Sequence, residues 1–131
     1  MIYSFLQNGD SAVTVQFKNE ISEEVNRRVT GLCNRIEAKH IDGIVELVPT
    51  FASLTVFYDC TIINSKKLKK KVEALINGKE CDVKSTAKVW NIPVCYDDEF
   101  ALDMKNVCSH TALEREEVIK LHTSKPYLIY M

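Results

Sequence analysis

The order of apolar and polar positions predicts two short strands at the start of the chain. Residues 12–17 alternate between apolar and polar side chains, as a half-buried strand does, and an apolar run precedes them at residues 2–6. Between these runs, Asn8 and Gly9 supply the positive φ that a tight turn requires. This pattern predicts an antiparallel hairpin.

After Ile21 the spacing of apolar residues changes to that of a helix. Ser22 is the expected N-cap, acidic residues follow it where the helix dipole favours anions, and Asp42 and Gly43 are expected to end the helix. Apolar side chains then recur every three or four residues, which predicts one buried stripe. Its members are Val25, Val29, Leu32, Cys33 and Ile36.

A second hairpin and a second helix are predicted next. Residues 44–48 and 53–58 are rich in strand-forming side chains, and Pro49 lies between them. Asn64 or Ser65 is the expected cap of the helix that follows. Four antiparallel strands with two helices on one face make a two-layer α+β domain in the order ββαββα, which we expect to span residues 1–84. The buried stripe of the second helix is Leu68, Val72, Leu75 and Ile76.

Residues 85–131 are expected to begin a second domain. Residues 89–96 alternate in polarity and predict a strand, two short helices are predicted near 102–108 and 114–121, and a last strand is predicted at 126–131. Such strands need neighbours along their edges. We therefore expect this part either to fold back on the first domain or to form a homodimer, and the homodimer is favoured.

The composition is that of a globular protein and excludes several classes. The chain has 131 residues, 46% of them hydrophobic, with 17 basic and 18 acidic side chains, which excludes a disordered chain. Its 4 glycines and 3 prolines exclude a collagen-like chain, and no apolar run reaches the roughly 18 residues that a transmembrane helix requires. The 5 cysteines form no CxxC pair, so free thiols and a cytoplasmic location away from any membrane are expected.

The sequence motifs predict no catalytic group. The chain has neither a Gly-rich phosphate loop nor a nucleophile elbow, so we expect no catalytic residues, no cofactor-binding residues and no cofactor in this chain. Cys108, His110 and His122 come nearest to a metal cluster, but their spacing favours a structural thiol over a metal site.

Three surface features remain as candidates for binding. The lysine run at 66–71 could bind phosphate, but on a helix its charges spread over the solvent face, so a solvated surface is the favoured interpretation. The short helices within 102–122 resemble a helix-turn-helix in outline, but their acidic residues would repel a duplex, so no nucleic-acid partner is expected. Arg27 and Arg28 lie off the apolar stripe and form either an exposed charged face or a protein contact.

Several stretches of the chain together resemble one known family. They follow, in order, the pattern of the B subunit of 5-oxoprolinase, also called allophanate hydrolase subunit 1, a family that includes the sporulation kinase inhibitor KipI. No single stretch is diagnostic, and it is the collinear series that carries the resemblance. The stretches are Gly9–Ala12, Glu20–Val29, Gly43–Pro49, Ala52–Leu54, Tyr58–Asp59, Ile92–Tyr96, Glu99–Phe100, His110–Thr111 and Glu116–His122.

The resemblance implies a small N-terminal α+β domain and then a cyclophilin-like β-barrel, of which this chain is expected to hold only the opening portion. It also implies a non-catalytic part in an ATP-dependent 5-oxoprolinase, which converts 5-oxoproline to glutamate with its partner A and C subunits. The alternative that stays open is KipI-like inhibition of the autophosphorylation of a sensor histidine kinase. The expected protein-contact residues are Arg27, Arg28, Tyr127 and Ile129.

Overall fold

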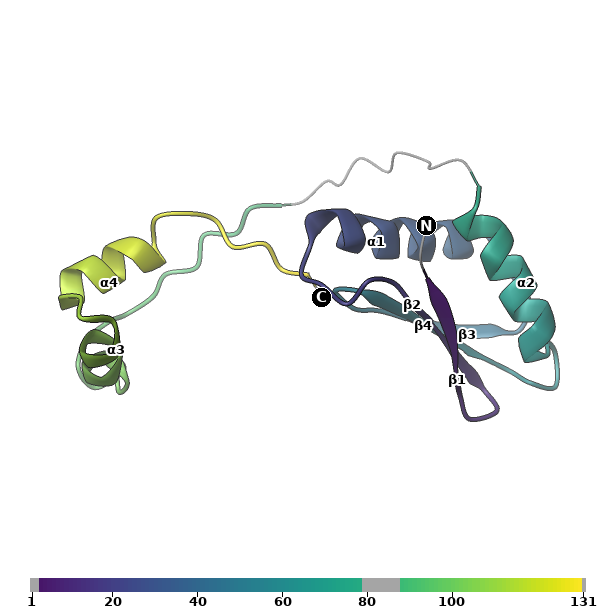
Figure 1. Cartoon of the computed structure of the whole chain (residues 1–131), viewed down its shortest axis with the longest axis horizontal. Helices are drawn as coiled ribbons and strands as arrows, with labels where there is room; N and C mark the ends of the chain where they lie inside the picture. Colours follow the sequence, from purple (N-terminus) through teal and green to yellow (C-terminus); the bar gives the residue numbers. More distant parts are fainter. Residues whose placement is uncertain (1–2, 79–87, 131) are drawn as a thin grey trace. The chain divides into compact units, whose positions relative to one another are not determined.

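The structure is a computed structural model, and it describes residues 3–78 and 88–130 (Figure 1). These residues form two compact units: residues 3–78 with Tyr130, called unit 1, and residues 88–129, called unit 2. The predicted domain boundary between residues 84 and 85 lies outside the described residues.

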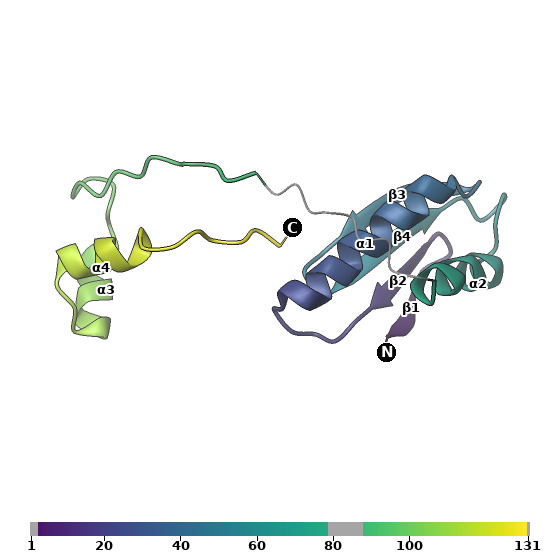
Figure 2. The same ribbon diagram turned by 90° about the horizontal axis from the view of Figure 1, so that it is seen from above.

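Unit 1 is built on a four-stranded antiparallel sheet with the strand order β1-β2-β4-β3. Both predicted hairpins are confirmed, because β1 pairs with β2 and β3 pairs with β4, and β2 pairs with β4 to join them. Two helices lie on the same face of this sheet (Figures 1 and 2), which confirms the predicted two-layer α+β fold. The elements are β1 (Ser4–Asn8), β2 (Ala12–Gln16), α1 (Glu23–Lys39), β3 (Ile44–Pro49), β4 (Ser53–Tyr58) and α2 (Ser65–Ile76).

Helix α1 buries the apolar stripe that its spacing predicts, since all 5 predicted members are buried. Ser22 is its N-cap, as expected, but the serine side chain makes no capping hydrogen bond. The predicted end at Asp42 and Gly43 was wrong, because the helix ends at Lys39. There His40 adopts a left-handed φ of 43°, and its backbone N–H donates to Glu37 O at 3.1 Å, which closes the last turn.

Helix α2 is capped by Asn64, one of the two residues expected there. Asn64 Oδ1 accepts a hydrogen bond from the backbone N–H of Lys67 at 2.9 Å, which satisfies a donor that the helix cannot pair internally. Three members of its predicted stripe are buried and Leu75 is half-buried. The buried members are Leu68, Val72 and Ile76.

The core of unit 1 lies between the two helices and the inner face of the sheet. The strand register places Val13, Val15, Leu54 and Val56 on that face, and none of them is more than 2% exposed. Full burial of a side chain of this size stabilises a fold by about 1.5–3 kcal/mol. Unit 1 therefore has a core of its own.

The opposite face of the sheet, here called the open face, carries a row of side chains across all four strands. In the register, Leu6 is opposite Thr14, Thr14 is opposite Thr55, and Thr55 is opposite Val48. The hydroxyl oxygens of the two threonines are 2.8 Å apart and share a hydrogen bond. The centre of this row is thus polar, with its hydroxyl groups hydrogen-bonded to each other, and the two ends of the row are apolar.

Unit 2 contains the helices α3 (Met104–Thr111) and α4 (Arg115–His122), which confirms the two short helices predicted there. The strands predicted on either side of them were wrong, because residues 88–96 and 126–130 have no regular secondary structure. A strand is stable only beside a hydrogen-bonded neighbour. The described residues of unit 2 contain no strand, so neither segment has such a neighbour within its own unit.

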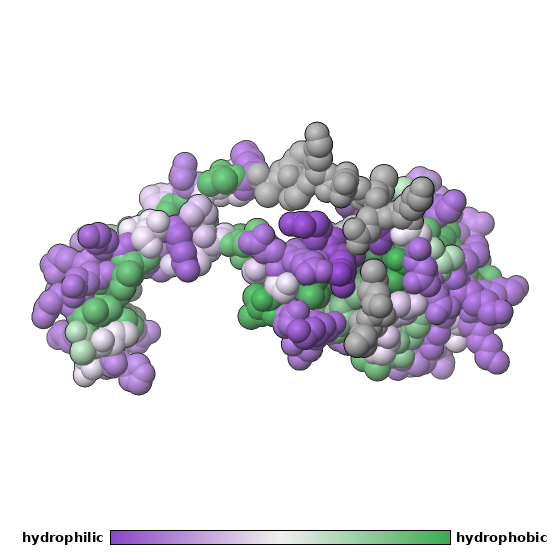
Figure 3. Space-filling model, turned by 45° about the horizontal axis from the view of Figure 1, so that its top comes forward, coloured by the Kyte–Doolittle hydropathy of each residue, from purple (hydrophilic) through white to green (hydrophobic). Residues whose placement is uncertain are grey.

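Unit 2 has no fully buried side chain among its described residues. Its large apolar side chains lie in solvent instead, including Trp90 at 69% exposure, Ile92 at 75% and Ile129 at 77%. Figure 3 shows apolar side chains, coloured green, at the surface of the molecule. The secondary structure of unit 2 therefore forms without a core to support it.

The longest described helix, α1, has 17 residues and begins with two glutamates. None of the helices in residues 3–78 and 88–130 is long and apolar enough to cross a membrane.

Candidate functional site

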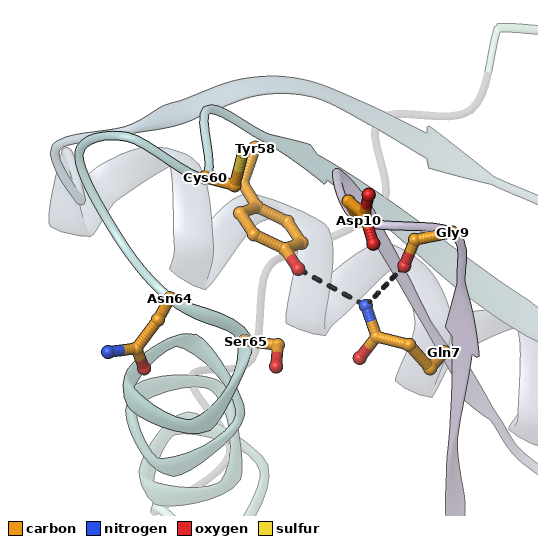
Figure 4. Close-up of a pocket in the computed structure, with 7 residues that line it drawn as sticks. All are labelled: Gln7, Gly9, Asp10, Tyr58, Cys60, Asn64 and Ser65. Carbon is orange, nitrogen blue, oxygen red and sulfur yellow. Dashed lines mark hydrogen bonds between the residues drawn. The ribbon is translucent and has the colours of Figure 1, made fainter.

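An open pocket of about 530 Å³ lies in unit 1, where the β1–β2 turn faces the end of β4 and the start of α2 (Figure 4). Gly9, in the turn, adopts a φ of +61°, which glycine tolerates at no steric cost. The pocket forms where the β1–β2 turn and the loop between β4 and α2 meet at one end of the sheet. Its lining residues are Gln7, Gly9, Asp10, Tyr58, Cys60, Asn64 and Ser65.

A hydrogen-bonded pair, Gln7 and Tyr58, fixes one wall of this pocket. Gln7 Nε2 donates to the hydroxyl of Tyr58 at 3.2 Å, to Gly9 O at 2.9 Å and to Ala12 O at 3.2 Å. Tyr58 is only 3% exposed, and its hydroxyl is at the pocket end of the ring (Figure 4). The pair ties β1 to β4 across β2 and holds the β1–β2 turn in place.

The opposite wall is the N-terminus of α2, which is unusual in its charge. The first turn contains no acidic residue, although helix N-termini favour anions, and it begins with Ser65, Lys66 and Lys67. Asp10 is the one carboxylate among the seven lining residues. The wall formed by α2 is therefore electropositive and the turn that faces it is acidic.

The chemistry available in the pocket is hydrogen bonding. The lining side chains supply two amides, a phenol and a hydroxyl, and Cys60 supplies an exposed free thiol. A nucleophilic thiol needs a neighbouring base or cation to lower its pKa. Among the described residues, no side chain hydrogen-bonds to Cys60, so the geometry is that of a polar pocket and lacks a nucleophile–base pair.

Asp59, between Tyr58 and Cys60, stabilises the loop that follows β4. Its Oδ1 accepts hydrogen bonds from the Thr61 hydroxyl at 2.6 Å and from the Thr61 backbone N–H at 2.8 Å. These bonds favour the ionised form, and they hold the pKa of the Asp59 carboxyl below its ordinary value. The loop is therefore ordered by an ionised carboxylate at neutral pH.

Unit 2 contains a second polar cluster, which ties its irregular segments to α4. The Tyr96 hydroxyl hydrogen-bonds to His122 Nδ1, and the His122 ring lies 5.7 Å from that of Tyr127, centroid to centroid. Arg115 pairs with Asp98 at 2.5 Å and donates to the backbone carbonyl of Tyr96. The hydrogen bond and charge of Arg115 hold the pKa of Asp98 below its ordinary value. These polar contacts, and not an apolar core, hold the irregular segments of unit 2 against α4.

No metal centre forms within residues 3–78 and 88–130, because no group of three or more His, Cys, Asp or Glu side chains converges there. Cys108 is a half-buried free thiol on α3, and His110 is exposed near the end of the same helix. His122 lies on α4, where its partner is a tyrosine. Within the described residues, Cys108, His110 and His122 therefore do not form a set of metal ligands.

The predicted contact residues fall into two pairs, one in each unit. In unit 1, Arg27 is exposed, whereas Arg28 is half-buried and its Nη2 contacts Glu24 Oε1 at 2.5 Å, one turn earlier in α1. In unit 2, Tyr127 is 60% exposed and Ile129 is 77% exposed, both in the irregular segment after α4. Three of the four side chains are therefore accessible, and Arg28 is committed to an ion pair within its own helix.

Sequence spacing did not indicate the contacts that build the pocket wall in unit 1 and the polar cluster in unit 2. Gln7 is opposite Val13 in the register, so it lies on the inner face of the sheet, and a polar side chain at a core-facing position was the available signal. Tyr96 and His122 are 26 residues apart, and no sequence spacing indicates their contact.

Comparison with known proteins relates the whole chain to one family. A family model described as the carboxyltransferase domain, subdomain C and D, matches residues 3–131. The B subunit of 5-oxoprolinase from Bacillus subtilis (strain 168) is 35% identical over 139 residues, which cover 98% of this chain and 58% of that protein. The conserved uncharacterized protein PH0987 from Pyrococcus horikoshii is 33% identical, with a TM-score of 0.55 over 93% of this chain and 56% of that chain.

A further solved structure is the N-terminal domain of the histidine kinase inhibitor KipI from Bacillus subtilis. It is 35% identical, with a TM-score of 0.49 over 57% of this chain and 84% of that domain.

The fold is that of an α+β domain with both helices on one face of an antiparallel sheet, shared with the solved relative from Pyrococcus horikoshii. The chain belongs to the carboxyltransferase domain family, subdomain C and D. The resemblance to the B subunit of 5-oxoprolinase is confirmed along nearly all of the chain. The chain spans a little over half the length of these two relatives.

Proposed function

We propose that this chain acts as a non-catalytic B-type component of an ATP-dependent 5-oxoprolinase, which opens 5-oxoproline to glutamate together with the A and C subunits of the same complex. The observation that carries this proposal is the 35% identity to a 5-oxoprolinase B subunit over 98% of the chain. No cofactor is assigned to this chain. We place the complex in the cytoplasm, where thiols such as the buried Cys33 stay reduced.

The two units suit two different parts in such a complex. Unit 1 has its own core, whereas unit 2 exposes apolar side chains of the kind that mark protein contacts. Tyr127 and Ile129 are the contact residues that we assign to unit 2. Arg27 is the one that we assign to unit 1, because its guanidinium is exposed and arginine is enriched at interface anchors.

Copurification tests the proposal. The chain would be expressed with tagged A and C subunits encoded by the same genome, and retention on the affinity resin would be measured. We expect the C subunit to retain this chain. We expect the purified chain alone to show no ATP-dependent opening of 5-oxoproline, and turnover above background would contradict a non-catalytic part.

Two variants locate the contact. Replacing Tyr127 and Ile129 together by alanine should weaken retention at least about tenfold, because truncation of central apolar contacts costs more than 1 kcal/mol each at interface hot spots. The matched control is Lys39→Ala, an exposed cation in the last turn of α1, which should leave retention unchanged. Equal loss in both variants would argue against a specific contact.

The kinase alternative is tested in a separate assay. A sensor histidine kinase is tested for autophosphorylation with the chain in large excess. The proposal predicts no inhibition. Inhibition of the kinase without binding to the C subunit would replace the proposed function by the alternative.

A further inference from the structure

The two edges of the sheet in unit 1 differ in how they are protected. An edge strand presents unpaired N–H and C=O groups, and natural proteins block such edges with charges, prolines or bulges. Strand β3, at one edge, has all three, because its pairing with β4 is irregular between Ile44 and Glu46, Glu46 is charged, and Pro49 lacks an N–H. That edge is closed to a further strand.

Strand β1, at the other edge (Figure 2), has none of these features. Its five residues contain no charge and no proline, and its register with β2 is regular from Ser4 to Asn8. Leu6, at its centre, is 49% exposed at the end of the open-face row. No strand lies on the outer side of β1 in the part of the chain that the structure describes. The sheet therefore has one protected edge and one that can accept a strand.

We propose that β1 is a self-association surface, which pairs antiparallel with β1 of a second copy of this chain about a two-fold axis at Leu6. This pairing joins two four-stranded sheets into one continuous sheet, and it closes as a dimer because the same strand is used by both copies. The interface goes beyond the proposed function, since it needs neither the A nor the C subunit.

The sequence of β1 favours a second copy over a foreign strand. With the axis at Leu6, the two leucines meet on the open face, Ser4 meets Asn8 at each end, and Phe5 meets Gln7. Cross-strand pairs stabilise a sheet when they match in character, and like charges opposite each other destabilise it. The Leu6 pair is apolar, the Ser4–Asn8 pairs are polar, the Phe5–Gln7 pairs are mixed, and no residue is charged, so the strand can pair with itself without repulsion.

Sedimentation velocity over a wide range of concentrations, on the full chain of 131 residues, tests the dimer. We expect a monomer–dimer equilibrium. Hydrogen–deuterium exchange at the same concentrations then locates the interface in the unaltered protein. Protection of the β1 amides should rise with concentration, while protection of β3 stays constant. A chain that is monomeric at every concentration, or a dimer with unchanged β1 protection, overturns the proposal.

Leu6→Lys places two like charges at the two-fold axis, and it should weaken the dimer at least tenfold. The control is Val48→Lys, which puts the same charge at the other end of the same row, where the side chain is 37% exposed. It should leave the dimer unchanged. Circular dichroism checks that both variants are folded. A dimer that persists in folded Leu6→Lys, including one formed through the apolar segments of unit 2, also overturns the proposal.

Discussion

Units 1 and 2 carry apolar side chains at similar spacing, but only unit 1 buries them. In unit 1, α1 and α2 cover a sheet whose inner face is apolar, so the stripe of each helix has a surface to contact. In unit 2, α3 and α4 pack only against each other and irregular chain, and none of their side chains is fully buried. Amphipathic spacing is therefore sufficient for a helix, while a core also requires a second apolar surface.

The first way to test this difference is to remove one leucine from each unit. Leu32→Ala in α1 should lower the free energy of unfolding by about 2–5 kcal/mol, because Leu32 has no exposed surface and leaves a cavity. Leu121→Ala in α4 should change it by less than about 0.5 kcal/mol, because Leu121 is 57% exposed. Urea unfolding followed by circular dichroism measures both. A large effect at Leu121 would show that unit 2 has a core in solution.

The difference between a unit with a core and a unit without one also explains which features could be predicted from the sequence. The hairpins, the helices and the stripe of α1 follow from local spacing, so they were predicted within a few residues. The left-handed end of α1 at His40 was missed, because Asp42 and Gly43 gave a stronger stop signal three residues later. The strands expected around Trp90 and Tyr127 were predicted from alternation alone, which cannot supply the partner strand that makes them stable.

The candidate pocket was beyond sequence reasoning for the same physical reason. It depends on Gln7 reaching Tyr58, 51 residues away, across a sheet whose strand order is not sequential. Local signals placed Asn64 at the start of α2, but nothing local brings that cap beside the β1–β2 turn. The pairing of strands that are distant in the sequence decides which residues meet. The local spacing of apolar and polar residues does not predict that pairing.

The rates at which cysteines in the two units react test the same difference in burial without any mutation. Cys33, on α1 in unit 1, is buried, and this burial together with Glu37 raises the pKa of its thiol. Cys95, in unit 2, is exposed. Iodoacetamide should label Cys33 at least about tenfold more slowly than Cys95, because the thiolate is the reactive form and opening of the core is required. Mass spectrometry of labelled peptides gives both rates, and equal rates would mean that the core of unit 1 opens freely.

The helix caps should differ between the units as well. Asn64→Ala removes the bond to Lys67 N at the start of α2 and should lower the stability of unit 1 by about 1 kcal/mol. Glu117→Ala removes the acceptor 3.1 Å from the backbone N of Glu114 at the start of α4, and should reduce local helicity without shifting the main unfolding transition. A shift of that transition by Glu117→Ala would couple the two units.

The smallest effects concern two carboxylates, one in each unit, whose pKa values are both lowered: Asp59 is half-buried and Asp98 is exposed. For Asp59 the causes are hydrogen bonds from Thr61, and for Asp98 they are the hydrogen bond from Arg115 and then its charge. Because the pKa of the folded form lies below that of the unfolded form, each carboxylate stabilises its unit above the unfolded pKa. This contribution is lost as the pH falls through the folded pKa.

Salt separates the two causes, because screening weakens the interaction between exposed charges and leaves a short hydrogen bond to a neutral hydroxyl nearly unchanged. In a titration followed by NMR, raising the ionic strength to about 1 M, where the Debye length is about 3 Å, should move the pKa of Asp98 upward toward its ordinary value. The pKa of Asp59 should stay low. Thr61→Val removes the hydroxyl and should raise the pKa of Asp59 alone. If both pKa values were equally sensitive to salt, charge would also hold the Asp59 loop. The distinction between a loop fixed by hydrogen bonds in unit 1 and an ion pair in unit 2 would then be wrong.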